Sequence, residues 1–301
     1  SPASFNNHIG VPLSILSIKP EHEVAVIEMG DNHEGEITAL CEIAKPTHGL
    51  ITNIGHDHIG MSGGYEANVR SKLEFYKYIT PPLGEKGPIN FLNDKDEMLV
   101  KESSGLNNVL YVSGEVLPGT DKQTFVVDGT EIKTNLFGEF NLDNIRAAFT
   151  IGKYFEVDTE KIKKALESFE PKSNRSQIKK TDKNAVVLDA YNANPESMAL
   201  AIKSFEKMDG EKMMILGDMF ELGQFAEEEH RKIIQIVEKA NIETLFVGSE
   251  FKKLENEALK FFENREDLAS YLKNKNIENK TILIKGSRGM ALEKILEENV
   301  L

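Results

Sequence analysis

Short runs of apolar, β-branched residues alternate along the chain with segments whose apolar positions recur at helical spacing. The first run, EVAVIEM at residues 23–29, is continuous and therefore predicts a strand buried on both faces of a parallel sheet. A helix-like segment follows at residues 35–44, and HGLITNIG at residues 48–55 predicts a second strand. This order predicts a right-handed βαβ unit with ligand groups at the carboxyl ends of its strands.

The middle of the chain contains both strand-like runs and segments with helical spacing. A helix is predicted over residues 66–78, followed by strands at PINFLN and NVLYV. Alternating runs flank Asp128-Gly129, a preferred two-residue turn, which predicts a β-hairpin over residues 124–138. Two amphipathic helices are then expected, at residues 140–155 and 159–169.

A strand-helix rhythm restarts after a polar linker at residues 172–183. Buried strands are predicted in AVVLDAYNANP, KMMILGDM, TLFVG and TILIKGS, each followed by a helix, the last of which starts at Met290. Four such repeats indicate an open, doubly wound α/β domain. We therefore expect an α/β protein with a first domain at residues 1–172 and a second, Rossmann-like domain at residues 173–301.

Composition narrows the class of protein. The 301 residues are 40% hydrophobic and 28% charged, which is ordinary for a globular chain. The formal charge of −13 repels polyanions, so nucleic acid is not an expected partner. A single cysteine, Cys41, excludes an internal disulfide and fits a reducing compartment. Without a run of about 18 apolar residues or a basic-then-apolar leader, the cytoplasm is the expected location, with no membrane insertion.

Polar groups follow the first two predicted strands. A carboxylate at the end of an apolar strand needs compensation, so Glu28 is a candidate Mg²⁺ ligand, with a solvated strand end as the alternative. His56, Asp57 and His58 follow the second strand and should lie at the same sheet edge. From these residues alone, a polar loop with ordinary surface histidines is the favoured interpretation. The missing thiolates make a zinc site a weak alternative.

Further candidates each have a plain structural alternative. Lys72 on the predicted helix reads as a solvated surface charge. Asn141 and Asn144 are i,i+3 neighbours that could bind an amide or amine edge, although N-capping by Asn141 is the simpler role. Arg175 and Asp189 flank the predicted domain junction, where clefts form.

Glycines follow the later strands in LGDMFELG and KGSRGM, at Gly217, Gly223, Gly286 and Gly289. They either admit a ligand close to the backbone or simply serve turn geometry. Lys285 either binds an anion or faces solvent. The chain contains no GxGxxG, which gives a nicotinamide enzyme no support.

Several motifs together resemble one family, the Mur ligases of bacterial cell-wall synthesis. The resemblance spans the whole chain, and two of its motifs, DAYNANP and GDMFELG, are the most specific. The full set of motifs is FNNHIGVP, IEMG with GEI, TNIGHDH, the SKLE helix, G-x-F-N-x-x-N-x-x-AA, DAYNANPESM, LGDMFELG and KGSRGM.

The resemblance is strongest to members that join D-alanyl-D-alanine to UDP-N-acetylmuramoyl-tripeptide. It implies an ATP- and Mg²⁺-dependent ligase that forms an acyl phosphate and then an amide, acting as a monomer when full length. It also implies an N-terminal domain and a phosphate loop before FNNHIGVP; no G-x-x-x-x-G-K-[ST] occurs in the chain. We therefore expect a truncated central domain with little activity alone. Another amino-acid ligase of this family and a non-catalytic truncation remain the alternatives.

The same resemblance assigns roles to the candidate residues. It implies Mg²⁺ ligation by Glu28, His58 and Lys72, the lysine in a carbamylated form. It implies that Asn141 and Asn144 contact adenine. Phe140 occupies a position where many relatives have histidine, so that one contact of the family differs here. The other implied roles are nucleotide binding by Asn141, Asn144, Arg175 and Asp189, contact with the UDP-sugar by Asn6 and Asn7, and contact with the dipeptide by Asn192, Asn194 and Ser287.

Overall fold

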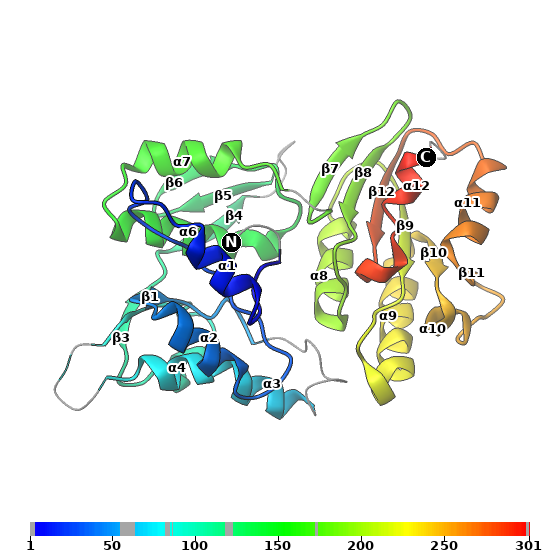
Figure 1. Ribbon diagram of the computed structural model, residues 1–301. Helices are drawn as coiled ribbons and strands as arrows, with labels where there is room; N and C mark the ends of the chain where they lie inside the picture. Colours follow the sequence, from blue (N-terminus) through cyan, green and yellow to red (C-terminus); the bar gives the residue numbers. More distant parts are fainter. Residues whose placement is uncertain are drawn as a thin grey trace. The chain divides into compact units, whose positions relative to one another are not determined.

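The computed structural model describes residues 4–54, 64–81, 85, 87–117, 123–171, 174–298 and 301. The chain divides into two compact units, Ser1–Val112 and Ser113–Leu301, which are described one at a time. Figure 1 follows the elements along the chain. The predicted boundary between residues 172 and 173 lies outside the described residues and stays a prediction. In the described part of the chain no helix is both long and apolar enough to cross a membrane.

Unit 1 consists of short helices around a small parallel sheet with strand order β1-β2-β3. Its core joins Cys41, Phe75, Leu92 and Leu99 from four different elements. Its elements are α1 (Gly10–Leu16), α2 (Glu36–Ala44), β1 (His48–Gly49), α3 (Tyr65–Lys72), α4 (Glu74–Ile79), β2 (Ile89–Leu92), α5 (Glu97–Glu102) and β3 (Asn107–Leu110).

The first predicted strand is wrong. Residues 23–29 run without regular secondary structure, and Val24 and Val26 are 53% and 77% exposed. Apolar β-branched residues favour an extended backbone, but a strand also requires a neighbour to complete its hydrogen-bond ladder. No strand in the described part of unit 1 pairs with this segment, and the second predicted strand is confined to β1. Glu28 therefore lies exposed in an irregular segment rather than at the end of a buried strand.

The helix predicted over residues 66–78 is divided at Leu73 into α3 and α4. Glu74, the first residue of α4, is buried, and its carboxylate accepts hydrogen bonds from the backbone N–H groups of Gly35 and Thr38. These donors belong to the first turn of α2, where the helix itself leaves N–H groups unpaired. Glu74 thus caps a neighbouring helix, which anchors α4 against α2.

Unit 2 contains the predicted hairpin, β5 (Thr124–Val127) and β6 (Thr130–Lys133). Both turn residues have positive φ, 49° at Asp128 and 73° at Gly129, as a type I′ turn requires. A strand that the sequence did not predict, β4 (Gly114–Leu117), extends the sheet on the other side of β5. A 3₁₀ turn η1 (Glu139–Asn141) leads into α6 (Leu142–Tyr154), and α7 (Thr159–Ser168) follows, as predicted.

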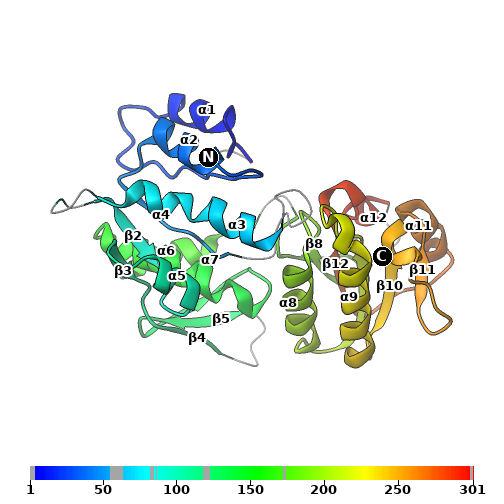
Figure 2. The same cartoon turned by 90° about the horizontal axis from the view of Figure 1, so that it is seen from below.

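The rest of unit 2 is a six-stranded sheet with the order β11-β10-β9-β12-β8-β7, parallel except for β7. Helices α8 and α9 cover one face, whereas α11 and α12 cover the other, as Figure 2 shows. The α/β, doubly wound prediction is confirmed. The elements are β7 (Gln177–Lys180), β8 (Ala185–Asp189), α8 (Pro195–Glu206), β9 (Glu211–Gly217), η2 (Gly223–Phe225), α9 (Ala226–Ala240), β10 (Glu243–Val247), α10 (Ser249–Lys252), β11 (Lys260–Phe262), α11 (Arg265–Lys273), β12 (Lys280–Lys285), η3 (Arg288–Met290) and α12 (Lys294–Glu297).

Candidate functional site

Asn6 and Glu28 meet in unit 1. The Asn6 Nδ2 donates to Glu28 Oε1 at 3.0 Å, and the backbone N–H of Gly30 donates to the Asn6 carbonyl at 2.8 Å. A Cβ at Gly30 would lie 2.7 Å from Asn6 Nδ2, so a side chain there would displace the asparagine. The predicted substrate residue and the predicted metal ligand are therefore neighbours, although they are 22 residues apart.

Asn7 has a structural contact instead. Its Oδ1 accepts from the N–H groups of Ile9 and Gly10 at 3.1 and 2.9 Å, which satisfies donors at the start of α1. The predicted role of Asn7 in substrate binding stays a prediction, and a variant at this position would also disturb α1.

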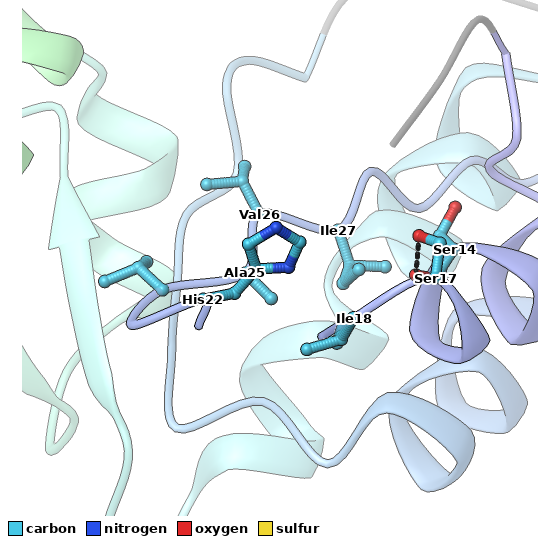
Figure 3. Close-up of a pocket in the computed structure, with 8 residues that line it drawn as sticks. Ser14, Ser17, Ile18, His22, Ala25, Val26 and Ile27 are labelled. Carbon is cyan, nitrogen blue, oxygen red and sulfur yellow. Dashed lines mark hydrogen bonds between the residues drawn. The ribbon is translucent and has the colours of Figure 1, made fainter. Parts of the chain in front are cut away.

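A hollow of about 160 Å³ lies between the end of α1 and the irregular segment at residues 22–27 (Figure 3). Its only hydrogen bond drawn between lining residues joins the Ser17 hydroxyl to the Ser14 carbonyl. None of the predicted site residues lines it. Its lining consists of Ser14, Ser17, Ile18, His22, Val24, Ala25, Val26 and Ile27.

Lys72 is the last residue of α3 and is half-buried. Its neighbours tie this helix to the loop before α2, because Arg70 pairs with Glu34 at 2.6 Å and the Ser71 hydroxyl donates to the His33 carbonyl at 3.3 Å. The predicted residues 56 to 58, including His58, lie outside the described residues. Across the described ranges, no three His, Cys, Asp or Glu side chains gather as a metal site. The predicted Glu28, His58 and Lys72 cluster stays a prediction.

Asn141 and Asn144 lie together in unit 2. The Asn144 Nδ2 donates to Asn141 Oδ1 at 3.1 Å, and the Asn141 Nδ2 donates to the Phe137 carbonyl at 2.8 Å. Asn141 is the N-cap residue of α6 by position, but its side chain makes no capping hydrogen bond. The alternative of N-capping by the side chain is therefore wrong, because the carboxamide is used to connect the two asparagines with the preceding loop.

Asp189 and Lys285 form a buried ion pair at the carboxyl ends of β8 and β12. They are directly opposite each other in the parallel ladder, and Nζ lies 2.7 Å from Oδ2. The Lys285 side chain is 2% exposed and that of Asp189 is 14% exposed. Asp189 also accepts from the Ser176 N–H at 2.9 Å, and the lysine donates to the Asn192 carbonyl at 3.3 Å. Lys285 faces Asp189 rather than solvent.

Arg175 lies in a conformationally strained loop beside this pair. Its neighbours Asn174 and Ser176 both have left-handed backbones, with φ of 59° and 47°. Such conformations are unfavourable for non-glycine residues and persist where surrounding contacts fix them. Here the Asn174 carbonyl accepts from the Ala190 N–H at 2.9 Å, while the guanidinium lies 3.8 Å from the centre of the Tyr191 ring. The loop therefore aims a cation at the end of β8.

The three residues predicted to contact the dipeptide lie near the ends of β8 and β12. Asn194 caps α8 in a capping box with Ser197, with hydrogen bonds of 2.7 and 3.1 Å. Asn192 Oδ1 accepts from the Ala193 N–H at 2.9 Å. The Ser287 hydroxyl is buried, accepts from the Phe220 N–H at 2.8 Å and faces the Ala193 carbonyl at 3.4 Å. Their predicted roles remain untested.

Packing accounts for two of the strand-end glycines. A Cβ at Gly286 would lie 3.0 Å from the Gly217 Cα and 2.9 Å from Leu292 Cδ1. A Cβ at Gly217 would lie 2.8 Å from the same leucine atom. Close packing of the backbone, rather than the turn geometry considered from the sequence, therefore requires glycine at these two positions.

Sequence reasoning missed a buried pair, Asp218 and His230. Asp218 directly follows β9, and its oxygens accept from the N–H groups of Glu250 and Phe251 at 2.9 and 3.0 Å. His230 on α9 has Nε2 3.6 Å from the aspartate Oδ1. The available signal was a histidine on the apolar stripe that continues with Ile233, Ile234 and Val237, a position that needs hydrogen-bond partners.

The ends of β8 and β12, the loop after β12 and the loop before β7 thus bring a carboxylate, an ammonium, a buried hydroxyl and a guanidinium to one edge of the sheet. This is the edge where open α/β sheets bind ligands. The Arg175 guanidinium suits phosphate oxygens, and the hydroxyl and amide groups suit a polar organic ligand.

Two family models match the chain, one over each part of it. The family model of the Mur ligase middle domain matches residues 1–152, and that of the Mur ligase, glutamate ligase domain matches residues 174–288. The UDP-N-acetylmuramoyl-tripeptide--D-alanyl-D-alanine ligase of Bacillus subtilis is 32% identical over 98% of this chain and 68% of its own length.

Solved structures agree. The structure of MurF from Acinetobacter baumannii superimposes with a TM-score of 0.85 at 27% identity, over 99% of this chain and 69% of that chain. A MurF ligase from Thermotoga maritima in complex with ADP has a TM-score of 0.86 at 22% identity, covers 100% of this chain and 72% of its own, and shows likeness of fold. The family models, the B. subtilis relative and these folds agree over both units, and the chain belongs to the Mur ligase family.

Proposed function

We propose that the chain takes part in the ATP-dependent joining of D-alanyl-D-alanine to UDP-N-acetylmuramoyl-tripeptide in the cytoplasm, a step of peptidoglycan precursor synthesis. The observation that carries this proposal is the 32% identity with the B. subtilis ligase of that name over 98% of the chain. The chain spans 68% of that ligase.

In this reaction the terminal carboxylate of the tripeptide attacks the γ-phosphorus of ATP, and ADP leaves. The amine of the dipeptide then attacks the acyl phosphate carbon, the C–O bond to phosphate breaks, and the nitrogen loses a proton. The first step brings a negatively charged carboxylate to the negatively charged polyphosphate, and the second brings the amine to the acyl phosphate carbon. Positioning of these groups therefore accounts for much of the rate.

Unit 1 supplies the residues proposed for carboxylate activation. Glu28 offers a hard oxygen ligand for Mg²⁺, and Asn6 orients it through the 3.0 Å hydrogen bond. Lys72 as an ammonium would repel a cation, so it fits a metal site only as its carbamate, which is anionic. Together with His58, these residues would hold Mg²⁺, which offsets repulsion between the carboxylate and the polyphosphate.

Unit 2 supplies the residues proposed for nucleotide and dipeptide. The connected carboxamides of Asn141 and Asn144 present donors and an acceptor for the edge of an adenine ring. Arg175 suits phosphate oxygens, and Asp189 suits ribose hydroxyls while Lys285 holds its carboxylate in place. Ser287, Asn192 and Asn194 are proposed to contact the incoming dipeptide.

The test is product formation measured by mass spectrometry with ATP, Mg²⁺, the tripeptide nucleotide and an acceptor. In the fusion protein described in the next paragraph, the amide should form with D-alanyl-D-alanine, and omission of any component should abolish it. Free D-glutamate, L-lysine and diaminopimelate serve as control acceptors, because single-amino-acid ligases of the family would use one of them. Equal phosphate release without the dipeptide would contradict the assignment.

A second arm supplies the remaining third of the B. subtilis ligase in the same polypeptide, joined to this chain. Activity in the fusion but not in the chain alone is expected if a phosphate loop is contributed by that third. Absence of product from both proteins, with the B. subtilis ligase active in parallel, would overturn the proposal.

A further inference from the structure

His230 is fully buried and has both ring nitrogens committed to backbone groups. Nδ1 lies 2.7 Å from the Ala226 carbonyl oxygen, and Nε2 lies 3.0 Å from the Met219 backbone nitrogen. A carbonyl oxygen only accepts and a backbone N–H only donates. Nδ1 therefore carries the proton and Nε2 is the acceptor, which is the neutral imidazole in a single tautomer.

The Met219 amide belongs to a loop that connects three strand ends. The next amide, Phe220 N–H, donates to the Ser287 hydroxyl at 2.8 Å, and the Ser287 N–H donates to the Asp218 carbonyl at 3.0 Å. The same hydroxyl faces the Ala193 carbonyl at 3.4 Å. His230 thus fixes the loop after β9, that loop is hydrogen-bonded to Ser287 in the loop after β12, and Ser287 in turn bonds the loop after β8.

The surroundings favour the neutral ring. Burial lowers the pKa of His230, and the Phe251 ring packs edge-on with ring centres 4.5 Å apart. The charged groups near it are Asp218 at the end of β9 and, on or next to α10, Glu250 and Lys253, which pair with each other at 2.6 Å. The Asp218 carboxylate is already engaged by two N–H groups of α10, so it has little need of an imidazolium partner.

We propose that His230, as the neutral Nδ1–H tautomer, is a positioning residue for the ligase reaction, since its Nε2 holds the Asp218–Phe220 loop in the position that sets the Ser287 hydroxyl. This inference rests on the proposed function only in naming the dipeptide as the ligand that Ser287 contacts. His230 itself touches no substrate. Protonation would place an N–H against the Met219 N–H and turn the ring toward Asp218, which releases the loop.

Two substitutions separate the two hydrogen bonds of the His230 ring, the one to Met219 and the one to Ala226. In His230→Gln the side-chain oxygen can reach the Nε2 position and accept from Met219, while the donor to Ala226 is lost. In His230→Asn the side-chain nitrogen can replace Nδ1 as donor, while the acceptor for Met219 is lost. Each of the two variants, His230→Gln and His230→Asn, therefore loses one hydrogen bond at the same buried site.

The first measurement is made on the chain itself, with ¹⁵N-labelled histidine and amide hydrogen exchange. The ¹⁵N shifts should show a neutral Nδ1–H ring at pH 7 and still at a pH where a model histidine, with a pKa of about 6.5, is mostly charged. Exchange of the Met219 amide should accelerate by about tenfold or more in His230→Asn relative to His230→Gln, the loss expected for one buried hydrogen bond. An Nε2–H ring, or equal exchange in both variants, would overturn the proposal.

The second measurement is kinetic and uses the active ligase fusion. For D-alanyl-D-alanine, kcat/KM should fall by about tenfold in His230→Asn and by clearly less in His230→Gln, with the KM for ATP unchanged in both. Equal losses for both substrates in both variants would mean that His230 only stabilises the fold. If the unchanged fusion forms no amide, the proposed function fails, whereas the exchange data still decide whether His230 fixes the loop.

Discussion

Replacing Lys285 by methionine removes one member of a buried ion pair while keeping an unbranched side chain of similar length. The ammonium is 2.7 Å from Asp189 Oδ2, and the lysine side chain is 2% exposed. Without it, the carboxylate retains the Ser176 N–H at 2.9 Å and partial contact with water, since Asp189 is 14% exposed. A broken buried pair costs about 3–5 kcal/mol, and these two compensations place Lys285→Met near the lower end, about 3 kcal/mol.

The same strand provides a matched control. Lys280, the first residue of β12, pairs with Glu243 at the same 2.7 Å, but these side chains are 24% and 43% exposed. The lysine hydrogen bond lowers the pKa of Glu243, so the pair does interact. Solvent screens it, and Lys280→Met should cost no more than about 1 kcal/mol. The two variants differ in burial and agree in residue type, distance and strand.

Native-state hydrogen exchange of the β12 amides, followed at increasing urea, measures the free energy of opening for this sheet specifically. Lys285→Met should lower it by about 2 kcal/mol more than Lys280→Met, the difference between the two expected costs. Adding Asp189→Leu to Lys285→Met should recover part of the loss, because no unpaired charge then remains buried, while the Ser176 N–H still lacks its acceptor. Equal costs for the two lysines would refute the reasoning that burial decides the strength of this pair.

Three further outcomes are expected. Gly286→Ala should lower stability by about 1–3 kcal/mol in a urea titration, because its Cβ would meet Leu292 and the Gly217 Cα at 2.9 and 3.0 Å. Glu74→Ala should cost about 1–3 kcal/mol and accelerate amide exchange at Gly35 and Thr38, whose N–H groups lose a buried acceptor. Because burial lowers the pKa of His230, the unfolded chain binds its proton first; the free energy of unfolding should therefore fall as pH drops below about 6.5, and His230→Gln should flatten that slope.

The sequence predicted the elements whose local signals agree with each other. The hairpin around Asp128-Gly129 combines alternating runs with a turn that tolerates positive φ, and both residues have it. The doubly wound sheet follows from repeated strand-helix patterns that are long and strongly periodic. In contrast, β7 is a polar edge strand and β11 has three residues, so neither carries a readable pattern.

Where prediction failed, the missing information was the identity of a partner distant in the sequence. Residues 23–29 have strand composition, yet composition does not state whether a neighbouring strand is present. Asn141 has the residue type of an N-cap, yet its carboxamide bonds the Phe137 carbonyl that the η1 turn brings within 2.8 Å. Lys285 had two open roles, and its partner 96 residues away follows from the β8–β12 register, which no local pattern specifies.

Because the chain is negatively charged, the pairing of the carboxylates Asp189 and Asp218 affects how an anionic ligand can bind. At −13 overall, the protein repels a polyphosphate, and an unpaired carboxylate at the binding edge would add to that repulsion. At the described edge Asp189 is paired with Lys285, and Asp218 is held by the N–H groups of Glu250 and Phe251. Their negative charge is therefore offset before any ligand arrives. Arg175, which is stacked on Tyr191 rather than paired with these carboxylates, presents its guanidinium at an edge where an anion meets little local opposition.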